Sequence, residues 1–474
     1  MDKIVRTRMA PSPTGELHIG TLRTLLYNYA FARQNGGKFV IRIEDTDQKR
    51  LVEGSQERLL QTIKDYGLSW DEGPDIGGPY GPYKQTERLD IYNKYIKELL
   101  DKGLAYYCFC TPERLEEVRE IQKKAKKIPK YDRHCLNLSK EEIEKKINAG
   151  EKYVIRMKMP ENEVVEFEDI IRGKIKINTK ELDDQVLIKS DGIPTYHFAV
   201  VIDDHLMEIT HILRGDEWIS STPKHILLYK FFGWESPKFG HLTVLLDPTH
   251  KGKMSKRHGS VFARQFLDDG YLPEALLNFL MMLGWNPGTE KELFTLDEFV
   301  KEFSLEHLHK KQPIFDRKKL DFLNGHYIRQ KSNIELEILF KKFLPEADDG
   351  TIKVLVEILK ERIVKLGDLK DLTKFLFEDV EYDKELLLQR GVEENLAKEM
   401  ITKTKEVIEK EDVDSMQERL MELIKTNEWN VGKFFMVLRV AIAGAPVTPP
   451  IVECLPLLGK EKILKKLDIA LKKL

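Results

Sequence analysis

Two distant segments of the sequence contain residues that could bind a nucleotide. The first is a proline-rich turn at residues 11–15, which is followed by His18 and Gly20. The apolar spacing of residues 18–35 predicts a helix, so both residues would lie in its first turn. Unpaired backbone N–H groups and the helix dipole favour an anion there, and glycine lets a ligand approach the backbone closely.

The second segment is Lys253-Met254-Ser255-Lys256-Arg257, which stands between Gly252 and Gly259. Its cations and its hydroxyl group could close over a polyphosphate and stabilise charge that develops in a transition state. Each segment alone has an ordinary alternative, helix capping for the first and a solvated surface loop for the second. Together, in this order and roughly 230 residues apart, they indicate one nucleotide site.

The elements that would position these segments alternate between strands and helices. Residues 3–8 and 38–43 are predicted as short strands on either side of the helix at 18–35. This order favours a parallel sheet with a ligand site at the strand ends. Further elements are predicted downstream: a helix at 53–66, strands at 200–202 and 209–213, and a helix around 226–228.

Two regions depart from this alternation. Residues 106–190 open with a cysteine cluster, continue through a lysine run at 123–130 and end in strand-like alternation, so we expect an inserted domain. From about residue 326 the chain is rich in lysine and glutamate with helical periodicity, as at 352–366 and 394–411. A helical module at the C-terminal end is therefore predicted.

The two nucleotide-binding segments together resemble the paired motifs of class I aminoacyl-tRNA synthetases. Four further stretches resemble bacterial glutamyl-tRNA synthetases: RMAPSPTG at 8–15, RIEDTD at 42–47, PTYH at 194–197 and LRGDEW at 213–218. The resemblance runs from Arg6 to the C-terminal helices and is most specific over roughly the first 325 residues. Thr21 departs from the motif, because many class I enzymes have a second histidine there, and this puts more weight on His18.

The resemblance implies an α/β protein in which a Rossmann-like parallel-sheet catalytic domain carries an inserted acceptor-binding domain and is followed by all-helical anticodon-binding domains. The expected parts are the first half of the catalytic domain (1–105), the inserted acceptor-binding domain with the cysteine cluster (106–190), the second half with the lysine loop (191–260), a stem-contact connective region (261–325) and the helical anticodon-binding region (326–474). The helical end argues against the related glutaminyl enzymes, which end in β-barrels. The length argues against the truncated paralogue that lacks an anticodon module.

The implied reaction is an ATP-dependent ligation. Glutamate attacks the α-phosphorus of ATP, with Mg²⁺ bridging the phosphates, and the glutamyl group of the adenylate then passes to the 3′-terminal ribose of tRNA(Glu). His18, Lys253 and Lys256 are the residues expected to stabilise the transition state, and their presence argues against a binder that has lost catalysis. The implied ATP-binding set is Pro11, Thr14, Gly15, His18, Gly20, Thr21, Lys253, Met254, Ser255, Lys256 and Arg257.

A glutamate site must hold one ammonium and two carboxylates, and a fixed cation would separate glutamate from glutamine. Arginine suits that task because its planar fork pairs with a carboxylate in a bidentate manner. The resemblance assigns the role to Arg8, Ser12, Glu44, Tyr196 and Arg214. Glu44 would receive the ammonium, Arg8 and Arg214 the carboxylates, and Tyr196 would donate its hydroxyl. The alternative is that Glu44 forms a structural ion pair with Arg42 or Arg8 and that Tyr196 belongs to the core.

The cysteines predict a metal site. Four are too few for a disulfide framework in a chain of this length, and three lie close in the sequence: Cys108, Cys110 and Cys135. Structural Zn²⁺ sites use four N or S ligands, and family members with this site supply the fourth where this chain has Asn137. Tyr131 or His134 would complete the tetrahedron. The alternative is that reduced cysteines are buried as small apolar groups.

A tRNA partner requires local basic patches, because 77 Lys and Arg nearly cancel 79 Asp and Glu, leaving a net charge of −2. The candidate patches are Lys123, Lys124, Lys126 and Lys127, and Lys310, Lys311, Arg317, Lys318 and Lys319. Arg362 resembles the arginine with which discriminating family members read the last anticodon base, and a solvated helix face is the alternative. The sequence leaves both tRNA(Glu) and tRNA(Gln) as acceptors.

No apolar run approaches the 18 or so residues of a membrane span, and the first residues lack the apolar stretch of an export signal. We therefore expect a cytoplasmic protein that does not enter a membrane. The resemblance implies a monomer.

Overall fold

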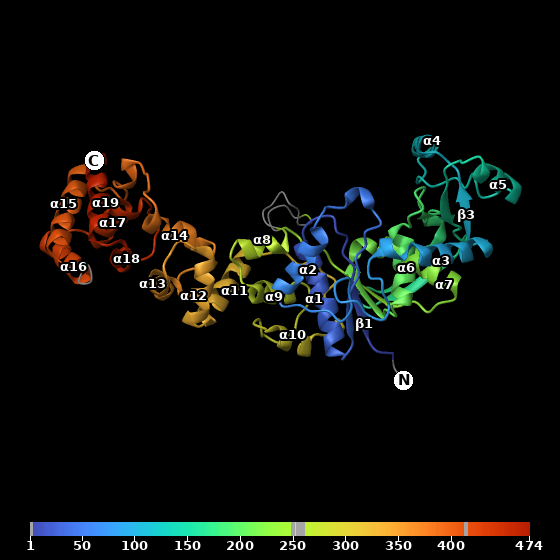
Figure 1. Cartoon of the computed structure of the whole chain (residues 1–474), viewed down its shortest axis with the longest axis horizontal. Helices are drawn as coiled ribbons and strands as arrows, with labels where there is room; N and C mark the ends of the chain where they lie inside the picture. The colour runs from blue at the N-terminus through green and yellow to red at the C-terminus, as the bar shows by residue number, and fades with distance from the viewer. Residues whose placement is uncertain (1–2, 248–251, 253–260, 412–415) are drawn as a thin grey trace. The chain divides into compact units, whose positions relative to one another are not determined.

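The computed structural model describes residues 3–247, 252, 261–411 and 416–474. They form two compact units, and Figure 1 labels many of their helices. The first unit comprises Met1–Gln265 and Leu277–Asp316, and the second comprises Phe266–Leu276 and Arg317–Leu474.

The first unit mixes strands with helices. Its strands are β1 (Arg6–Met9), β2 (Lys38–Ile41), β3 (Ala105–Cys108), β4 (Val154–Met157), β5 (Val164–Asp169), β6 (Gly173–Asn178), β7 (Val186–Ile188), β8 (His211–Gly215) and β9 (Lys238–Leu242). Its helices are α1 (Ile19–Gln34), α2 (Ser55–Asp65), α3 (Leu89–Asp101), α4 (Pro112–Lys124), α5 (Lys140–Asn148), α6 (Tyr196–Leu206), α7 (Thr222–Phe232) and α10 (Leu296–Glu302). Helices α8 (Ala263–Asp268) and α9 (Pro273–Met281) contribute residues to both units.

Two pairs of parallel strands form the base of the site. Strand β1 pairs with β2, and β8 pairs with β9 so that Arg214 lies opposite His241. Thr210, just before β8, joins the two pairs: its N–H donates to the Arg6 carbonyl at 2.9 Å, and its Oγ1 accepts the Arg6 N–H at 2.8 Å. The spatial order of these strands is therefore β2, β1, β8, β9. Going along the chain, the step from β1 to β2 runs one way across the sheet and the step from β8 to β9 runs the other way, so the order reverses between β1 and β8. Folds of this kind bind ligands at such a point, outside the carboxyl ends of the strands.

The region after β3 contributes to two sheets. Strands β3, β4 and β7 form an antiparallel sheet, and α4 and α5 lie between β3 and β4 in the chain. Strands β5 and β6 form a hairpin, and β5 also pairs with β9. This hairpin therefore continues the sheet that contains β8.

The strand predicted at residues 200–202 is wrong, because these residues lie within helix α6. Val200, Val201 and Ile202 are β-branched residues that favour strands by propensity. Helix α6 buries these residues and also Asp203 and Asp204, so the apolar run shows no helical period. The strand predicted at 209–213 and the helix around 226–228 are confirmed as β8 and α7.

The described part of the second unit contains helices and no strand. These are α11 (Arg317–Gln330), α12 (Asn333–Phe343), α13 (Asp349–Leu359), α14 (Asp368–Phe377), α15 (Glu394–Lys410), α16 (Met416–Thr426), α17 (Val431–Ala443), α18 (Ile451–Leu458) and α19 (Lys460–Lys473). Helices α15, α17 and α19 pack together around one apolar core. The helical C-terminal module predicted from the sequence is confirmed.

Candidate active site

A cavity of about 440 Å³ lies at the carboxyl ends of β1 and β8. The first two turns of α1, the segment after β2, the segment after β9 and the first residue of α6 complete its wall. All the side chains predicted to bind glutamate line it: Arg8, Ser12, Glu44, Tyr196 and Arg214. These residues come from four separate stretches of the chain, and the sheet brings them to one edge.

The nucleotide motif at the start of α1 contributes to the same cavity through His18, Gly20 and Thr21. His18 is the N-cap of α1, and its Nδ1 accepts the Gly20 N–H at 3.0 Å. A side chain at position 20 would begin 3.3 Å from that Nδ1, so glycine allows the ring to close on the helix end. Because Nδ1 is an acceptor, the proton of the neutral ring lies on Nε2.

The other predicted ATP-binding residues lie elsewhere. Pro11, Thr14 and Gly15 belong to the turn before α1 and are outside the cavity lining. Gly15 has a φ of +142°, a backbone angle that favours glycine. The lysine segment lies outside the described residues: Lys253, Met254, Ser255, Lys256 and Arg257.

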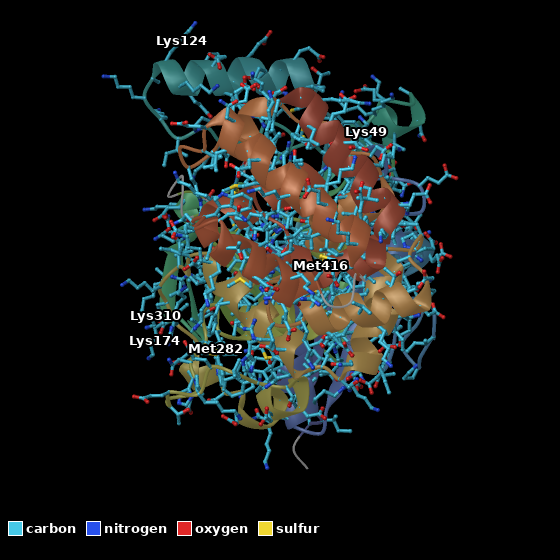
Figure 2. The ribbon with its side chains drawn as sticks, turned by 90° about the vertical axis from the view of Figure 1, so that its left-hand side faces the viewer. Lys49, Lys124, Lys174, Met282, Lys310 and Met416 are labelled. Atoms are coloured by element: carbon cyan, nitrogen blue, oxygen red, sulfur yellow. The ribbon has the colours of Figure 1, made fainter. Side chains whose placement is uncertain are left out.

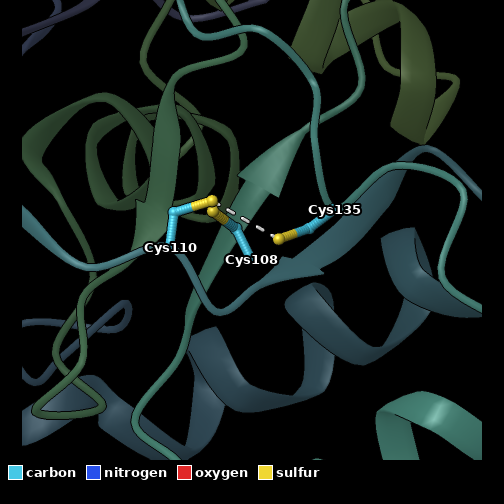
Figure 3. Close-up of side chains that lie close together, drawn as sticks. All are labelled: Cys108, Cys110 and Cys135. Atoms are coloured by element: carbon cyan, nitrogen blue, oxygen red, sulfur yellow. Dashed lines mark hydrogen bonds between the residues drawn. The ribbon is translucent and has the colours of Figure 1, made fainter. Parts of the chain in front are cut away.

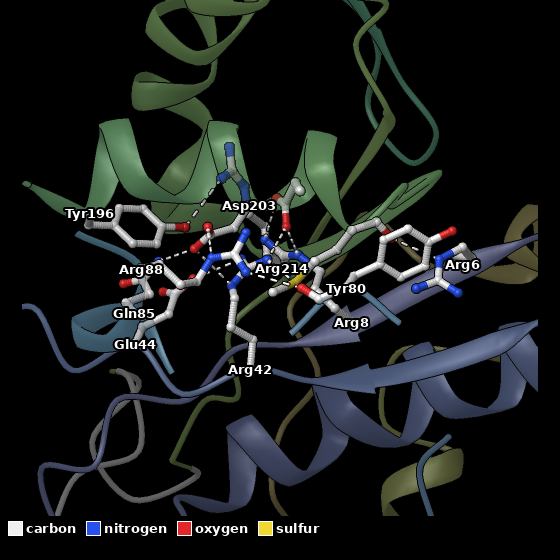
Figure 4. Close-up of polar contacts among 12 residues, drawn as sticks. Arg6, Arg8, Arg42, Glu44, Tyr80, Gln85, Arg88, Tyr196, Asp203 and Arg214 are labelled. Carbon is white, nitrogen blue, oxygen red and sulfur yellow. Dashed lines mark hydrogen bonds and ion pairs between the residues drawn. The ribbon is translucent and has the colours of Figure 1, made fainter. Parts of the chain in front are cut away.

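A buried network of arginines and carboxylates lies beside the cavity and lines it through Arg8 and Glu44 (Figure 4). Arg8 forms a two-pronged ion pair with Asp204, through Nε at 3.1 Å and Nη2 at 3.3 Å. Arg42 donates to Asp204 at 2.8 Å and to Glu44 at 2.9 Å. Burial opposes ionisation of Asp204, but Arg8 and Arg42 outweigh it and hold the pKa of this carboxyl below its usual value. Arg8 is therefore neutralised by Asp204, and Glu44 has the predicted ion pair with Arg42.

Arg214 differs from Arg8 because all its hydrogen-bond acceptors are uncharged. It donates to Thr222 Oγ1 at 2.8 Å, His241 Nε2 at 3.1 Å, His225 Nδ1 at 3.2 Å and Tyr196 Oη at 3.5 Å. Burial lowers the pKa values of both histidines, which keeps the rings neutral. Among the described residues no carboxylate lies within ion-pair distance of Arg214, although only 5% of this arginine is exposed.

An uncompensated guanidinium at this depth favours an anion in the cavity. Burial lowers the pKa of Arg214, yet a guanidinium stays protonated in proteins. Moving a charge out of water is unfavourable unless a partner of opposite sign approaches it. The cavity therefore presents a carboxylate-binding cation at Arg214 and a carboxylate at Glu44.

Several lining residues were not predicted as site residues. Trp218 packs against Tyr196 with the rings tilted by 40° and their centroids 4.3 Å apart, and Glu217 also lines the cavity. Both lie within the LRGDEW motif at 213–218, so the sequence contained a signal that could have identified them as site residues. Arg23 lies one turn further along α1 and donates to the backbone carbonyls of Leu283 and Thr243. Nothing in its local sequence distinguishes Arg23 from an ordinary helix residue.

A second cluster of chemistry-bearing residues contains Cys108, Cys110 and Cys135 (Figure 3). Their sulfur atoms lie within 4.8 Å of one another, and the pair Cys110–Cys135 is at 3.5 Å. Tyr131 is buried against them: its Oη lies 3.2 Å from Cys108 Sγ and 3.4 Å from Cys110 Sγ. His134 is exposed, and its side chain makes no hydrogen bond or ion pair with any other residue that the structure describes. Of the two predicted fourth ligands, Tyr131 is the one beside the sulfurs.

Comparison with known proteins identifies the relatives of both units. Residues 4–322 match the family "tRNA synthetases class I (E and Q), catalytic domain", and residues 335–471 match "Anticodon binding domain". The chain is 45% identical to a glutamate–tRNA ligase of Clostridioides difficile and 44% identical to one of Alkaliphilus metalliredigens, each over 98% of both proteins. A crystal structure of a glutamate tRNA ligase from Elizabethkingia meningosepticum, in complex with its amino acid, is 38% identical over the full length of both chains with a TM-score of 0.84.

The match to the class I catalytic family over residues 4–322, together with the parallel strands and the helical C-terminal unit, identifies a class I aminoacyl-tRNA synthetase. Within this class the chain belongs to the glutamate–tRNA ligase family. Enzymes of this class use ATP and Mg²⁺. In the described part of the chain no helix has the length and apolar character needed to cross a membrane.

Proposed function

We propose that the chain activates L-glutamate with ATP and transfers the glutamyl group to the 3′-terminal ribose of tRNA(Glu). A carboxylate oxygen of glutamate attacks the α-phosphorus of ATP, and pyrophosphate leaves. The ribose hydroxyl then attacks the acyl carbon and AMP leaves. The observation that carries the proposal is the buried Arg214, which has no carboxylate partner among the described residues and lines one cavity with His18 and Glu44.

The proposed glutamate site divides the charges of the substrate between named groups. Glu44 receives the ammonium, Arg8 and Arg214 hold the carboxylates, and Ser12 and Tyr196 supply hydroxyl groups. The ion pair between Glu44 and Arg42 orients the Glu44 carboxylate and leaves its second oxygen for the ligand. Glutamine lacks the second carboxylate, so it would leave the Arg214 cation buried and unpaired.

The proposed nucleotide site uses the start of α1. His18 Nε2–H would donate to the phosphate that carries the developing charge, and the positive end of the α1 helix dipole would add to this stabilisation. Mg²⁺ supplies the neutralisation of the phosphate oxygens when ATP is bound. Lys253 and Lys256 are proposed to act on the same phosphates, on the strength of their motif.

The experiment that tests this function is glutamate-dependent exchange of labelled pyrophosphate into ATP, in the presence of tRNA(Glu). We expect exchange with glutamate and a much lower rate with glutamine or aspartate. Charging of tRNA(Glu) with labelled glutamate tests the second step. A protein that binds tRNA and ATP but supports no exchange under any of these conditions contradicts the proposal.

Glutamate binding is expected to weaken as the pH falls below 7. Burial raises the pKa of Glu44 to about 7, against the opposing charges of Arg42 and Arg8. The ammonium needs the ionised form of Glu44, so the neutral form that dominates below this pKa binds poorly. The KM for glutamate should be about 10-fold higher at pH 6 than at pH 8, while the KM for ATP changes little. A KM for glutamate that is flat between pH 6 and 8 contradicts this role of Glu44.

We propose that the cysteine cluster binds structural Zn²⁺, with Tyr131 as the fourth ligand. The sulfur positions suit the ion, because a tetrahedron with Zn–S bonds of about 2.3 Å has edges of about 3.8 Å. The hydroxyl of Tyr131 contacts the sulfur atoms of Cys108 and Cys110. Arg114 Nη1 lies 3.4 Å from Cys110 Sγ and donates to it, which helps to hold this sulfur in place.

Zinc affinity should fall by at least about 10-fold in the variant Tyr131→Phe, because only the hydroxyl group is lost. His134→Ala is the control, and we expect it to bind zinc as the wild type does. Elemental analysis after mild purification and competition with a zinc-binding dye measure both variants. Equal affinity in wild type and Tyr131→Phe contradicts the assignment of Tyr131, and a wild type free of zinc contradicts the site.

For tRNA binding by the second unit we propose a cationic cluster of Arg390, Lys433 and Arg439. Lys433 donates to the Gly391 carbonyl at 2.9 Å, and Arg439 donates to Thr448 Oγ1 at 3.1 Å. Burial and the charge of Arg390 lower the pKa of Arg439, which indicates that like charges face each other. In the part of the chain that the structure describes, none of the three forms an ion pair with a carboxylate. Phosphates or base edges of tRNA would supply the missing acceptors.

Two variants of the second unit should affect tRNA in different ways. Arg439→Ala is expected to raise the KM for tRNA(Glu) and tRNA(Gln) alike by about 5- to 50-fold, with unchanged KM values for glutamate and ATP.

Arg362, exposed after α13, is proposed to read the anticodon, so Arg362→Gln should raise charging of tRNA(Gln) relative to tRNA(Glu). Arg419→Ala, which removes a cation already paired with Glu411, is the control. Equal charging of both tRNAs by the wild type contradicts the role of Arg362.

The surface of α4 is a further proposed tRNA contact. Lys124, labelled in Figure 2, ends this helix, and Lys126 and Lys127 follow it in exposed positions. Lys123 is paired with Glu120 at 2.7 Å, so its charge is partly compensated. We therefore propose that Lys124, Lys126 and Lys127 contribute more to this patch than Lys123.

A further inference from the structure

A buried chain of hydrogen bonds runs across the sheet behind Arg214. Asp169 at the end of β5 accepts from His241 Nδ1 at 2.5 Å, and His241 on β9 accepts from Arg214 Nε through its Nε2 at 3.1 Å. Asp169 and His241 are almost fully buried. The chain therefore links three neighbouring strands, β5, β9 and β8, and ends at the cavity.

Each group in this chain has its donor and acceptor roles determined by its neighbours. The backbone N–H groups of Ile171 and Arg172 donate to Asp169 Oδ1 at 2.9 and 2.8 Å, which holds the carboxylate in place. An ionised carboxylate only accepts, so the proton of neutral His241 must lie on Nδ1. Its Nε2 therefore presents a lone pair to Arg214. The arrangement is the one by which a carboxylate selects a histidine tautomer in catalytic triads.

A second ring holds Arg214 from the opposite side. His225 Nδ1 accepts from Arg214 Nη1 at 3.2 Å, and His225 Nε2 lies 3.0 Å from His197 Nδ1. Because Nδ1 of His225 is an acceptor, its proton lies on Nε2 and is donated to His197. Neutral rings thus flank the guanidinium, and Thr222 accepts from the third nitrogen.

We infer that Asp169 and His241 are positioning residues that hold Arg214 with its charge unneutralised, and that they thereby determine the preference for glutamate over glutamine. The inference deepens the proposed function and rests on it. Asp169 restrains the Arg214 guanidinium only indirectly, through the imidazole of His241. The charge of Arg214 is therefore not neutralised by Asp169, and this charge and the remaining N–H donor of Arg214 are available to the ligand. A carboxylate in direct contact would occupy the fork instead, as Asp204 occupies that of Arg8.

The contrast between the two arginines supports this reading. Arg8 and Arg214 line the same cavity, but one has its own carboxylate and the other has imidazoles and hydroxyls. A cation that is already paired binds a carboxylate and a carboxamide with a smaller difference in free energy than an unpaired one. Discrimination between the two substrates would therefore come mainly from Arg214.

The variant Asp169→Asn tests the inference with almost no change in shape. Its amide cannot accept from Ile171 and Arg172 and from His241 at the same time, because one end of the amide is a donor. Rotation of the amide nitrogen toward His241 would move the ring proton to Nε2, where it opposes the Arg214 Nε–H. We expect the KM for glutamate to rise about 10- to 100-fold, with the KM for ATP within about twofold of wild type.

A second pair of variants, at His241, tests the inference even if the Asp169→Asn variant does not fold. His241→Leu removes the acceptor, and we expect a rise in the KM for glutamate of the same size. His241→Gln returns an oxygen near the position of Nε2 and should recover most of the loss. His211→Leu is the matched control, because His211 begins β8, the strand that carries Arg214, and bonds to Thr210 outside the glutamate cavity.

Pyrophosphate exchange with glutamate and with glutamine, in the presence of tRNA, gives every readout. A lowered ratio of kcat/KM for glutamate over glutamine in Asp169→Asn and His241→Leu, restored in His241→Gln, supports the inference. If the variants only yield less active enzyme, while the kcat/KM ratio and the KM values for glutamate and glutamine stay unchanged, the inference is wrong. A wild type that shows no glutamate-dependent exchange overturns the proposed function instead.

Discussion

Replacement of Arg214 by glutamine is expected to lower kcat/KM for glutamate by about 10²- to 10⁴-fold without loss of stability. The remaining Arg214 donor would contribute about 1.5–3 kcal/mol through a hydrogen bond to the carboxylate, and the charge of the buried guanidinium adds to this attraction. Stability should be unchanged or higher, because Arg214 is a buried cation with no ion pair among the described residues. Its removal takes away an uncompensated charge from the folded protein.

Exchange kinetics and urea unfolding of the same preparations measure both parts of this prediction. Arg33→Gln is the matched control, because Arg33 pairs with Asp71 at 2.6 Å, outside the glutamate cavity. We expect this control to keep its KM for glutamate. A KM for Arg214→Gln within twofold of wild type would remove Arg214 from the glutamate site. A large loss of stability would show that the cation has a structural partner in the free protein.

Replacement of Asp204 by alanine is expected to lower the free energy of unfolding by about 3–5 kcal/mol and to abolish glutamate activation. Asp204 is the common partner of Arg8 and Arg42, and all three side chains are buried. Breaking a buried ion pair by removing one partner leaves an uncompensated charge, which accounts for a loss of this size. Arg8 would also lose the carboxylate that orients it at the cavity.

The stability that Asp204 contributes should depend on pH in a defined direction. Its pKa is lowered in the folded chain, because Arg8 and Arg42 outweigh the effect of burial. A lowered carboxyl pKa adds stability above the unfolded value of about 3.9, and this stability is lost as the pH falls through the folded pKa. The difference between wild type and Asp204→Ala should therefore be constant from pH 5 to 8 and shrink below pH 4.

A surface ion pair provides the control for Asp204. Glu235→Ala removes the pair with Lys3 at 2.9 Å, in which both side chains are largely exposed. Exposed pairs contribute little to stability because water and salt screen them. Urea unfolding at pH 7 compares the two variants. Equal losses for Asp204→Ala and Glu235→Ala would contradict a buried network at the base of the site.

Much of the fold was predictable because its signals are local. The helix at 18–35 and the strands beside it follow from hydrophobic spacing, and they are confirmed as α1, β1 and β2. The helical C-terminal unit follows from long amphipathic segments such as α15, where Ala397, Ile401 and Ile408 lie on the buried face. Helix α6 was mistaken for a strand because a helix buried on all sides has no amphipathic period.

The sequence by itself determined which side chains are available: the histidine that caps a helix, the arginines and glutamate of the short motifs, and the three clustered cysteines. Only the tertiary structure decided which of them share a charge. Arg8 meets Asp204 across 196 residues and His241 meets Asp169 across 72 residues, so neither pair leaves a local pattern. Burial then amplifies these long-range contacts, because charges that are removed from water interact strongly only with the few groups that the fold brings within reach. For this reason the neutral surroundings of Arg214 became evident only when the strands were assembled.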